Sequence, residues 1–163
     1  MKIIETVSNT ITRPADTTAY TSGDLIANST TAGSVTPFTF FIPYGRGLLV
    51  NRAAVYRSAT SVTNASFRVH LYKDSPTVAN GDNGAISSTR SGYQGFIDVV
   101  GTAPAFSDAA AAFGIYVNNA LAAPMLILTD VDQLIYGLLE ARGAYTPSSA
   151  ETVVLSLIGE AYV

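Results

Sequence analysis

The stretch Ala65–Lys73, "ASFRVHLYK", decides the fold class, because apolar and polar side chains alternate along it. In an extended strand Phe67, Val69 and Leu71 face one side, and Arg68 and His70 face the other. A period of two is typical of a β-strand with one buried face. Similar short runs rich in Val, Ile, Thr, Phe and Tyr recur along the chain, separated by Gly, Pro, Asn and Asp.

These runs predict an all-β protein. Besides "ASFRVHLYK" and "TPFTFFIPYG", we predict strands at 47–57, 94–100, 113–117, 125–129, 133–141 and 152–162, with short ones near 3–8 and 24–27. Strands and helices do not alternate, so we expect an antiparallel two-sheet sandwich of the jelly-roll type. Only "SDAAAAFG" has helical character, and it predicts at most one short helical turn near 107–113.

Residues 1–163 are expected to form a single β-sandwich domain, since the length suits one domain and no linker or repeat divides it. The polar, turn-rich segment 1–29 is interpreted as either an N-terminal arm or the first edge strand with its loop.

Composition excludes several classes of function. The net charge is −3 and the Lys and Arg residues are scattered, which argues against a nucleic-acid partner. Cysteine is absent, so neither disulfides nor thiolate metal sites can form. The apolar runs are too short to cross a bilayer, and we expect a soluble chain that folds in the cytosol without a membrane partner.

Charged residues make up only 13% of the chain, against about 25% in an average domain. Two interpretations stay open: part of the surface is covered by partners, or Ser, Thr, Asn and Gly coat it.

The segments 134–142, "LIYGLLEAR", and 152–163, "TVVLSLIGEAYV", are apolar on both strand faces. In a sandwich, one face of each strand packs in the core and the other face meets water. A strand that is apolar on both faces is therefore expected to have its outer face covered by other protein residues. The cover is either the chain's own loops or a second subunit. If it is a subunit, the predicted oligomer interface consists of Ile135, Leu139, Val154, Ile158 and Tyr162.

His70 is the only histidine and therefore the first candidate for chemistry. A general base needs an orienting carboxylate, and Asp74 lies about 13 Å away along an extended strand. Metal binding by histidine generally requires two or three of them. We interpret His70 as an exposed strand residue and assign no catalytic, cofactor or metal site.

Two acidic stretches are weaker candidates. "ANGDNGA" (79–85) places Asn80 and Asp82 at a spacing that superficially resembles a calcium loop, but the rest of that pattern fails and a tight turn fits better. "TDVDQ" (129–133) puts Asp130 and Asp132 on one face of a strand, which raises a hydrolase as a minor hypothesis.

Sugar binding is a fairer alternative, because jelly rolls serve many lectins. Tryptophan is absent, but several tyrosines lie near predicted strand ends, where a half-buried ring with a wetted hydroxyl is common. These are Tyr44, Tyr56, Tyr93, Tyr116 and Tyr145.

Three stretches together resemble small virion proteins of tailed bacteriophages. They are "TITRPADTTAYTSGDLIANS" (Thr10–Ser29), "FRVHLYKDSPTVANGDNGAI" (Phe67–Ile86) and "LIYGLLEARGAYTPSSAETVVLSL" (Leu134–Leu157). The resemblance implies a capsid decoration or cement protein of jelly-roll type, often trimeric, which binds the head shell. It carries no catalytic motif.

We therefore expect a non-enzymatic protein that assembles in the host bacterial cytoplasm and resides on the capsid surface of the virion. Its expected partners are copies of itself, as a homotrimer, and the phage major capsid protein. The alternative is a phage tail or fibre-associated domain that binds a host surface glycan.

Overall fold

The computed structural model describes residues 2–43, 46–58, 66–99, 106–108, 113–117 and 123–162, with the backbone alone for Lys2, 106–108, 113–117 and Tyr162. Within these ranges the chain forms strands and one 3-10 turn, η1 (Ala32–Ser34). The strands are β1 (Lys2–Thr12), β2 (Leu25–Ile26), β3 (Phe38–Phe41), β4 (Gly47–Arg57), β5 (Phe67–Tyr72), β6 (Tyr93–Val99), β7 (Phe106–Asp108), β8 (Phe113–Val117), β9 (Met125–Leu128), β10 (Leu134–Ala141) and β11 (Thr152–Tyr162). No helix in the described part of the chain has the length and apolarity needed to span a membrane.

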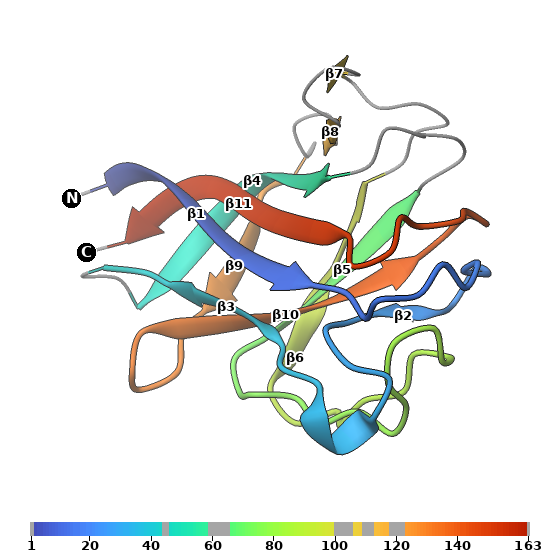
Figure 1. Ribbon diagram of the computed structural model, residues 1–163. Helices are drawn as coiled ribbons and strands as arrows, with labels where there is room; N and C mark the ends of the chain where they lie inside the picture. The colour runs from blue at the N-terminus through green and yellow to red at the C-terminus, as the bar shows by residue number, and fades with distance from the viewer. Residues whose placement is uncertain are drawn as a thin grey trace.

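The strands form two antiparallel sheets that pack face to face (Figure 1). A six-stranded sheet has the order β1-β11-β4-β8-β7, with β9 also paired to β4. A five-stranded sheet has the order β2-β10-β5-β6, with β3 also paired to β10. The predicted all-β antiparallel sandwich is therefore confirmed.

Pairing proceeds from the ends of the chain inward. β1 pairs with β11, β3 with β10, β4 with β9 and β5 with β6, so the chain resembles one long hairpin rolled into a sandwich. This nesting gives the jelly-roll strand order, in which each sheet interleaves early and late strands. It also places the two termini side by side at one end of the molecule (Figure 1).

The short helical turn predicted near 107–113 is wrong at Ser107, Asp108 and Phe113. The first two belong to β7 and the third to β8, and the pairs Ser107↔Gly114 and Asp108↔Phe113 join the two strands. Inter-strand pairing supplies the backbone hydrogen bonds here, so the capping potential of Ser107 is overridden. Residues 109–112 lie outside the described residues.

The main core lies between the two sheets. β5 contributes Phe67, Val69 and Leu71, which are fully buried, as the alternation in "ASFRVHLYK" predicts. The long strands β4 and β11 bury every second side chain against them, including Val55 and Leu155.

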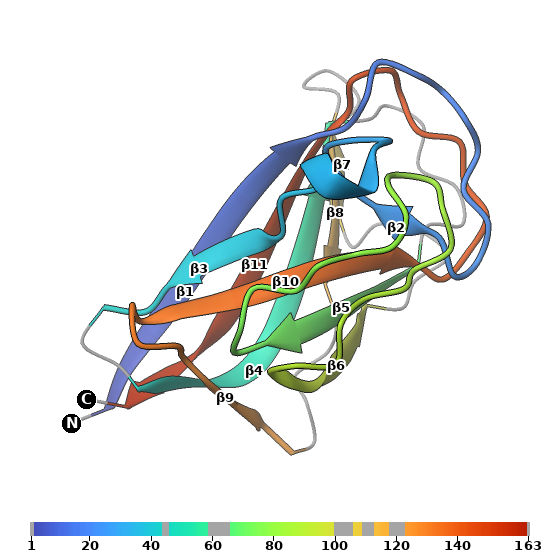
Figure 2. The same ribbon diagram turned by 90° about the horizontal axis from the view of Figure 1, so that it is seen from below.

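A second apolar cluster lies outside the sandwich, on the outer face of β10. Leu138 and Tyr136 pack there with Leu25 and with Ile86 from the loop that follows β5. Figure 2 shows this loop passing across β10 when the molecule is seen from below. The second apolar face of β10 is thus covered by the chain's own loops.

Candidate ligand groove and apolar sheet face

A groove on the outer face of the five-stranded sheet is the first candidate site. Its floor is β5, whose alternation turns His70 and Tyr72 away from the core. Tyr93 of β6 lines one side, and loop residues 86–90 line the other. The volume of about 420 Å³ falls within the range of small-molecule pockets, roughly 300–1,000 Å³.

The loop wall of the groove is tied to the floor. The hydroxyl groups of Tyr72 and Ser88 lie 2.7 Å apart in a hydrogen bond, and Ser88 forms a β-bridge with Val78. The loop then rejoins β6 at Gly92, which has φ 68° and approaches Asp74 closely. A Cβ at Gly92 would lie 2.5 Å from the Asp74 backbone nitrogen, so this close approach requires glycine.

His70 has a carboxylate partner that is distant in sequence. Its Nε2 lies 2.7 Å from Oε2 of Glu140 on β10, and Arg142 donates to the other carboxylate oxygen at 2.8 Å. Burial alone would raise the pKa of Glu140, but the hydrogen bonds from His70 and Arg142 outweigh it and hold that pKa below its usual range. On its other side, Nδ1 of His70 lies 3.3 Å from the Tyr93 hydroxyl.

A second ion pair lies beside this one. Arg68 donates two hydrogen bonds to Asp98, at 2.7 and 2.9 Å, and these bonds hold the pKa of Asp98 below its usual range. The Arg68 guanidinium also stacks over the Phe96 ring, 3.9 Å from its centroid. Phe96 and Tyr93 remain 46% and 43% exposed, so two aromatic rings face solvent beside fixed polar groups.

The arrangement suits binding better than nucleophilic catalysis. Among the described residues, His70 hydrogen-bonds to Glu140 and Tyr93, and neither presents an activated nucleophile to the groove. Asp74 is not its partner, because that carboxylate accepts a hydrogen bond from Ser91 instead. No group of three or more His, Asp or Glu residues in the described part of the chain could hold a metal ion.

Sequence reasoning missed Glu140 and the Arg68–Asp98 pair as members of this site. Glu140 carried a usable signal, because it is an acidic residue in the otherwise apolar strand β10 and alternates with Leu138 and Tyr136 on the outer face. Its position opposite β5 could not be read from spacing along the chain. His70 lies on the polar face of β5 as predicted, but the prediction that it is exposed is wrong. Its side chain is 15% exposed, because Glu140 of β10 and Tyr93 of β6 contact it.

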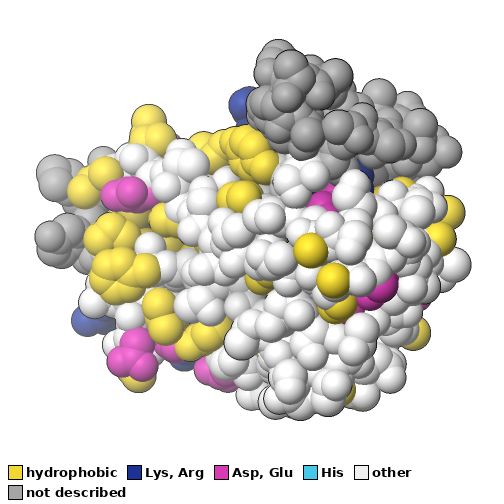
Figure 3. All heavy atoms as spheres, viewed as in Figure 1, with side chains coloured by type: hydrophobic (Ala, Val, Ile, Leu, Met, Phe, Trp, Pro, Cys, Tyr) yellow, Lys and Arg dark blue, Asp and Glu magenta, His cyan; other side chains and the backbone are white. Residues whose placement is uncertain are grey.

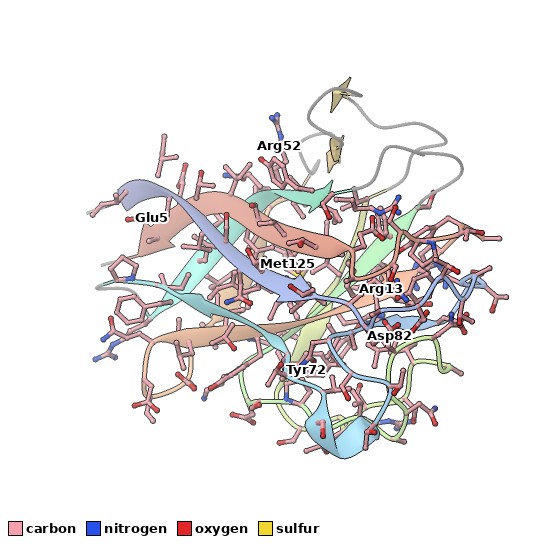
Figure 4. All side chains as sticks on the ribbon, viewed as in Figure 1. Glu5, Arg13, Arg52, Tyr72, Asp82 and Met125 are labelled. Carbon is pink, nitrogen blue, oxygen red and sulfur yellow. The ribbon has the colours of Figure 1, made fainter. Side chains whose placement is uncertain are left out.

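Asp82 lies in a buried cluster and not in an open site. Its carboxylate accepts hydrogen bonds from Arg13 at 2.7 Å, from the Tyr20 hydroxyl at 2.6 Å and from the backbone nitrogen of Ala27 at 2.7 Å. Figure 4 shows Arg13 and Asp82 together near the end of β1. Burial raises the pKa of Tyr20 far above its usual range, so its hydroxyl keeps the proton that it donates. The turn predicted at 79–85 is therefore an anchor for the loop.

The anchor continues into a stack of rings and cations. The Arg13 guanidinium lies 4.7 Å from the Tyr20 ring centroid, and the Tyr20 and Tyr145 rings are 4.9 Å apart. Arg57 lies 4.2 Å from the Tyr145 centroid and 2.6 Å from Glu151 in a buried ion pair. This stack joins the ends of β1, β4 and β11 at one end of the sandwich.

Asp130 and Asp132 do not form a carboxylate pair on a strand face. They lie in the turn between β9 and β10, where Asp130 accepts hydrogen bonds from the backbone nitrogens of Asp132 and Leu134. Asp130 also accepts from the Tyr136 hydroxyl at 2.9 Å. Burial and this hydrogen bond raise the pKa of Tyr136 to about 12. Asp130 thus stabilises a turn.

The tyrosines considered for sugar binding fall into different environments. Tyr145 is buried in the stack, Tyr56 is half-buried on β4, and Tyr93 is exposed at the groove. Tyr44 and the side chain of Tyr116 lie outside the described residues.

The outer face of the six-stranded sheet is the second candidate surface. Cross-strand pairing places Ile4, Glu160, Leu49 and Leu126 in one row across four strands. Leu128 follows Leu126 on the same face of β9, and Ile158 precedes Glu160 on β11. We call Ile4, Leu49, Leu126, Leu128 and Ile158 the apolar sheet face. Ile4 is 81% exposed, and Leu126 and Leu128 are 49% and 46% exposed.

The structure divides the predicted oligomer interface. Ile135 and Leu139 are fully buried between the sheets, so the prediction that they face a partner is wrong. The reason is that the outward face of β10 is the one that the loops cover, whereas Ile135 and Leu139 lie on its inward face and pack in the core. Val154 and Ile158 are half-buried on the outer side of β11, and the side chain of Tyr162 lies outside the described residues.

Neither a protein-family model nor a curated protein matches this sequence.

Proposed function

We propose that this protein is a non-enzymatic decoration protein of a tailed-phage head, which binds the assembled shell and copies of itself and stabilises the head. The apolar sheet face is the observation that carries the proposal. The jelly-roll strand order and the resemblance of three sequence stretches to small virion proteins support it.

The apolar sheet face suits docking because its residues lie on one face of the sheet. Leu49 and Leu126 are paired on the neighbouring strands β4 and β9, Leu128 lies beside them, and Ile4 lies on β1 across Glu160 of β11. Figure 3 shows further hydrophobic side chains at the end of the molecule where β1 and β3 lie, at the edge of the sandwich and beside this face. Contiguous exposed apolar patches on soluble proteins mark interaction sites.

Charged groups at this face would fix the orientation in which a partner binds. Glu160 lies within the row, and Arg52 is exposed beside Ile158 and points away from β4 in Figure 4. Apolar burial would supply most of the free energy, at about 25 cal/mol per Å² removed from water. The two charges would select the register of the partner.

Many modest contacts can retain such a protein on a shell. A trimer joined through the apolar sheet face would present three copies of the surface that meets the shell, and binding of the first copy raises the effective concentration of the others. Retention then depends on avidity and needs no catalytic residue or cofactor.

The proposal is tested with Leu126→Glu. We expect light scattering across a dilution series to give a trimer for the natural protein and a monomer for the variant. Sedimentation with heads of the phage that encodes the protein should carry down the natural protein and leave the variant in solution. Phe41→Ser is the matched control, because Phe41 is 56% exposed on the other sheet, and it should behave as the natural protein does.

A natural protein that stays monomeric and does not sediment with heads would overturn the proposal. So would a Leu126→Glu variant that remains folded, forms trimers and binds heads as the natural protein does.

A further inference from the structure

We propose that the groove floored by His70 and Tyr72 binds one pyranose ring of a bacterial surface glycan. The inference goes beyond docking on the shell, because the groove lies on the five-stranded sheet and the apolar sheet face lies on the six-stranded one. A head protein with such a groove would attach the particle weakly to glycan-coated surfaces.

Tyr93 supplies the apolar contact that a sugar ring needs. One face of a pyranose carries C–H groups, and such faces pack against exposed aromatic rings. Tyr93 is 43% exposed, and Tyr72 supports its ring edge to face, with centroids 5.1 Å apart and an interplanar angle of 60°. The stacking surface is therefore held in place before a ligand arrives.

His70 fixes the Tyr93 hydroxyl from the other side. Glu140, as a carboxylate, can only accept hydrogen bonds, so Nε2 of His70 carries the proton between them. In the neutral ring Nδ1 is then an acceptor for the Tyr93 hydroxyl at 3.3 Å. The Glu140–His70–Tyr93 chain reduces the side-chain entropy that binding would otherwise cost.

The loop wall offers the donors and acceptors that sugar hydroxyls require. Ser88 and Thr89 contribute hydroxyl groups, which both donate and accept. Arg90 is exposed on the rim, and its guanidinium has no hydrogen bond or ion pair with another described residue. Its donors are thus available to a ligand.

The charges favour a sugar over a phosphate-rich ligand. Arg68 is paired with Asp98 and Arg142 with Glu140, and of the described residues that line the groove Arg90 is the exposed cation. Polyanion binding depends on several clustered cations. One cation, several hydroxyls and an exposed ring match a neutral or singly charged sugar.

A bacterial glycan array, followed by saturation-transfer NMR with the free monosaccharides glucose, galactose, N-acetylglucosamine and rhamnose, tests the proposal. We expect at least one sugar to bind with a dissociation constant on the order of 1 mM. Tyr93→Ala should weaken binding about ten-fold through loss of the stacking surface. Arg90→Ala, a rim substitution that leaves the fold untouched, should also weaken it.

Phe41→Ala removes a ring elsewhere that is more exposed than that of Tyr93, and it should leave sugar binding unchanged. Leu126→Glu separates the two proposals, because it should abolish trimers without changing sugar binding. A blank array with blank NMR titrations would overturn the groove proposal while leaving the docking proposal intact. It would also be overturned if Tyr93→Ala and Arg90→Ala, both folded, bound the sugar as the natural protein does.

Discussion

Asp82 shows how one residue in a loop of turn-forming residues can hold the fold together. It accepts three hydrogen bonds, and its side chain and that of Arg13 are both fully buried. The neighbouring Gly81 permits this approach, because a Cβ there would lie 2.1 Å from the backbone of Thr30. The loop after β5 is thereby joined to the end of β1.

We expect Asp82→Asn to lower the free energy of unfolding by about 3 kcal/mol. The substitution removes the buried counter-charge of Arg13 and leaves it the partly exposed carboxylate of Asp16, 3.5 Å away. Urea unfolding of the purified protein measures this. Asp74→Asn, in the same loop but exposed, is the control and should change stability by less than about 0.5 kcal/mol. Equal effects of the two substitutions would show that the cluster does not anchor the loop.

The ion pairs of the groove predict a loss of stability in acid. The pKa values of Asp98 and Glu140 are lowered in the folded protein, so both carboxylates stabilise it above their unfolded pKa values. That stability is lost as pH falls through the lowered folded values. Urea unfolding between about pH 5 and pH 2 should therefore show a decreasing free energy of unfolding.

Asp98→Asn and Arg68→Ala should each make that decrease shallower, because each removes the pair responsible for part of it. An unchanged pH slope in both variants would assign the acid sensitivity to other groups.

At the scale of elements, the edge of β9 is protected by a side chain. β9 pairs with β4 on one side, and on the other the Gln94 amide of β6 bonds to both backbone groups of Leu128, each at 2.8 Å. The amide takes the place of a neighbouring strand. Because unpaired edges invite pairing with other chains, this contact both joins the sheets and blocks association through the edge.

Gln94→Ala should cost about 1–2 kcal/mol, since two hydrogen bonds of about 0.5–1.5 kcal/mol each are lost. Thermal unfolding measures the cost, and light scattering during storage should show faster aggregation. Gln94→Glu keeps the acceptor but loses the donor, so it should fall between the natural protein and Gln94→Ala. If Gln94→Ala matched the natural protein in both measurements, the amide would have no role at this edge.

β10 illustrates what strand patterns can and cannot predict. Its two apolar faces predict a cover on the outside, and the cover is the chain's own loop with Leu25 and Ile86. On β11 and β1 the outer face stays accessible at Ile4 and partly so at Ile158. Similar sequence patterns on two strands thus lead to one intramolecular cluster and one candidate docking face.

At the scale of the whole molecule, the two sheets carry different surfaces. The five-stranded sheet has a groove of fixed polar groups and exposed rings, while the six-stranded sheet has a row of apolar side chains. A protein that docks through the second face leaves the first free. This division is why substitutions at Leu126 and at Tyr93 test two separate proposals.

The local pattern of apolar and polar residues was sufficient to predict the fold class and the positions of most strands. Alternation in "ASFRVHLYK" predicts the buried face of β5, and the predicted 47–57 and 113–117 coincide with β4 and β8. Alternation works because successive side chains of a strand point to opposite faces, whatever the strand pairs with. The helical turn at 107–113 failed where pairing between β7 and β8 supplied the hydrogen bonds.

The sequence by itself determined an antiparallel β-sandwich, with His70 on the polar face of its strand. Only the tertiary structure decided that Glu140 meets His70, that Asp82 meets Arg13, and that Ile135 and Leu139 face the core. The physical reason is that alternation is a property of neighbouring residues, whereas ion pairs and covers depend on strand order. In a jelly roll, strand order brings together residues that are 70 or more positions apart, as for His70 and Glu140.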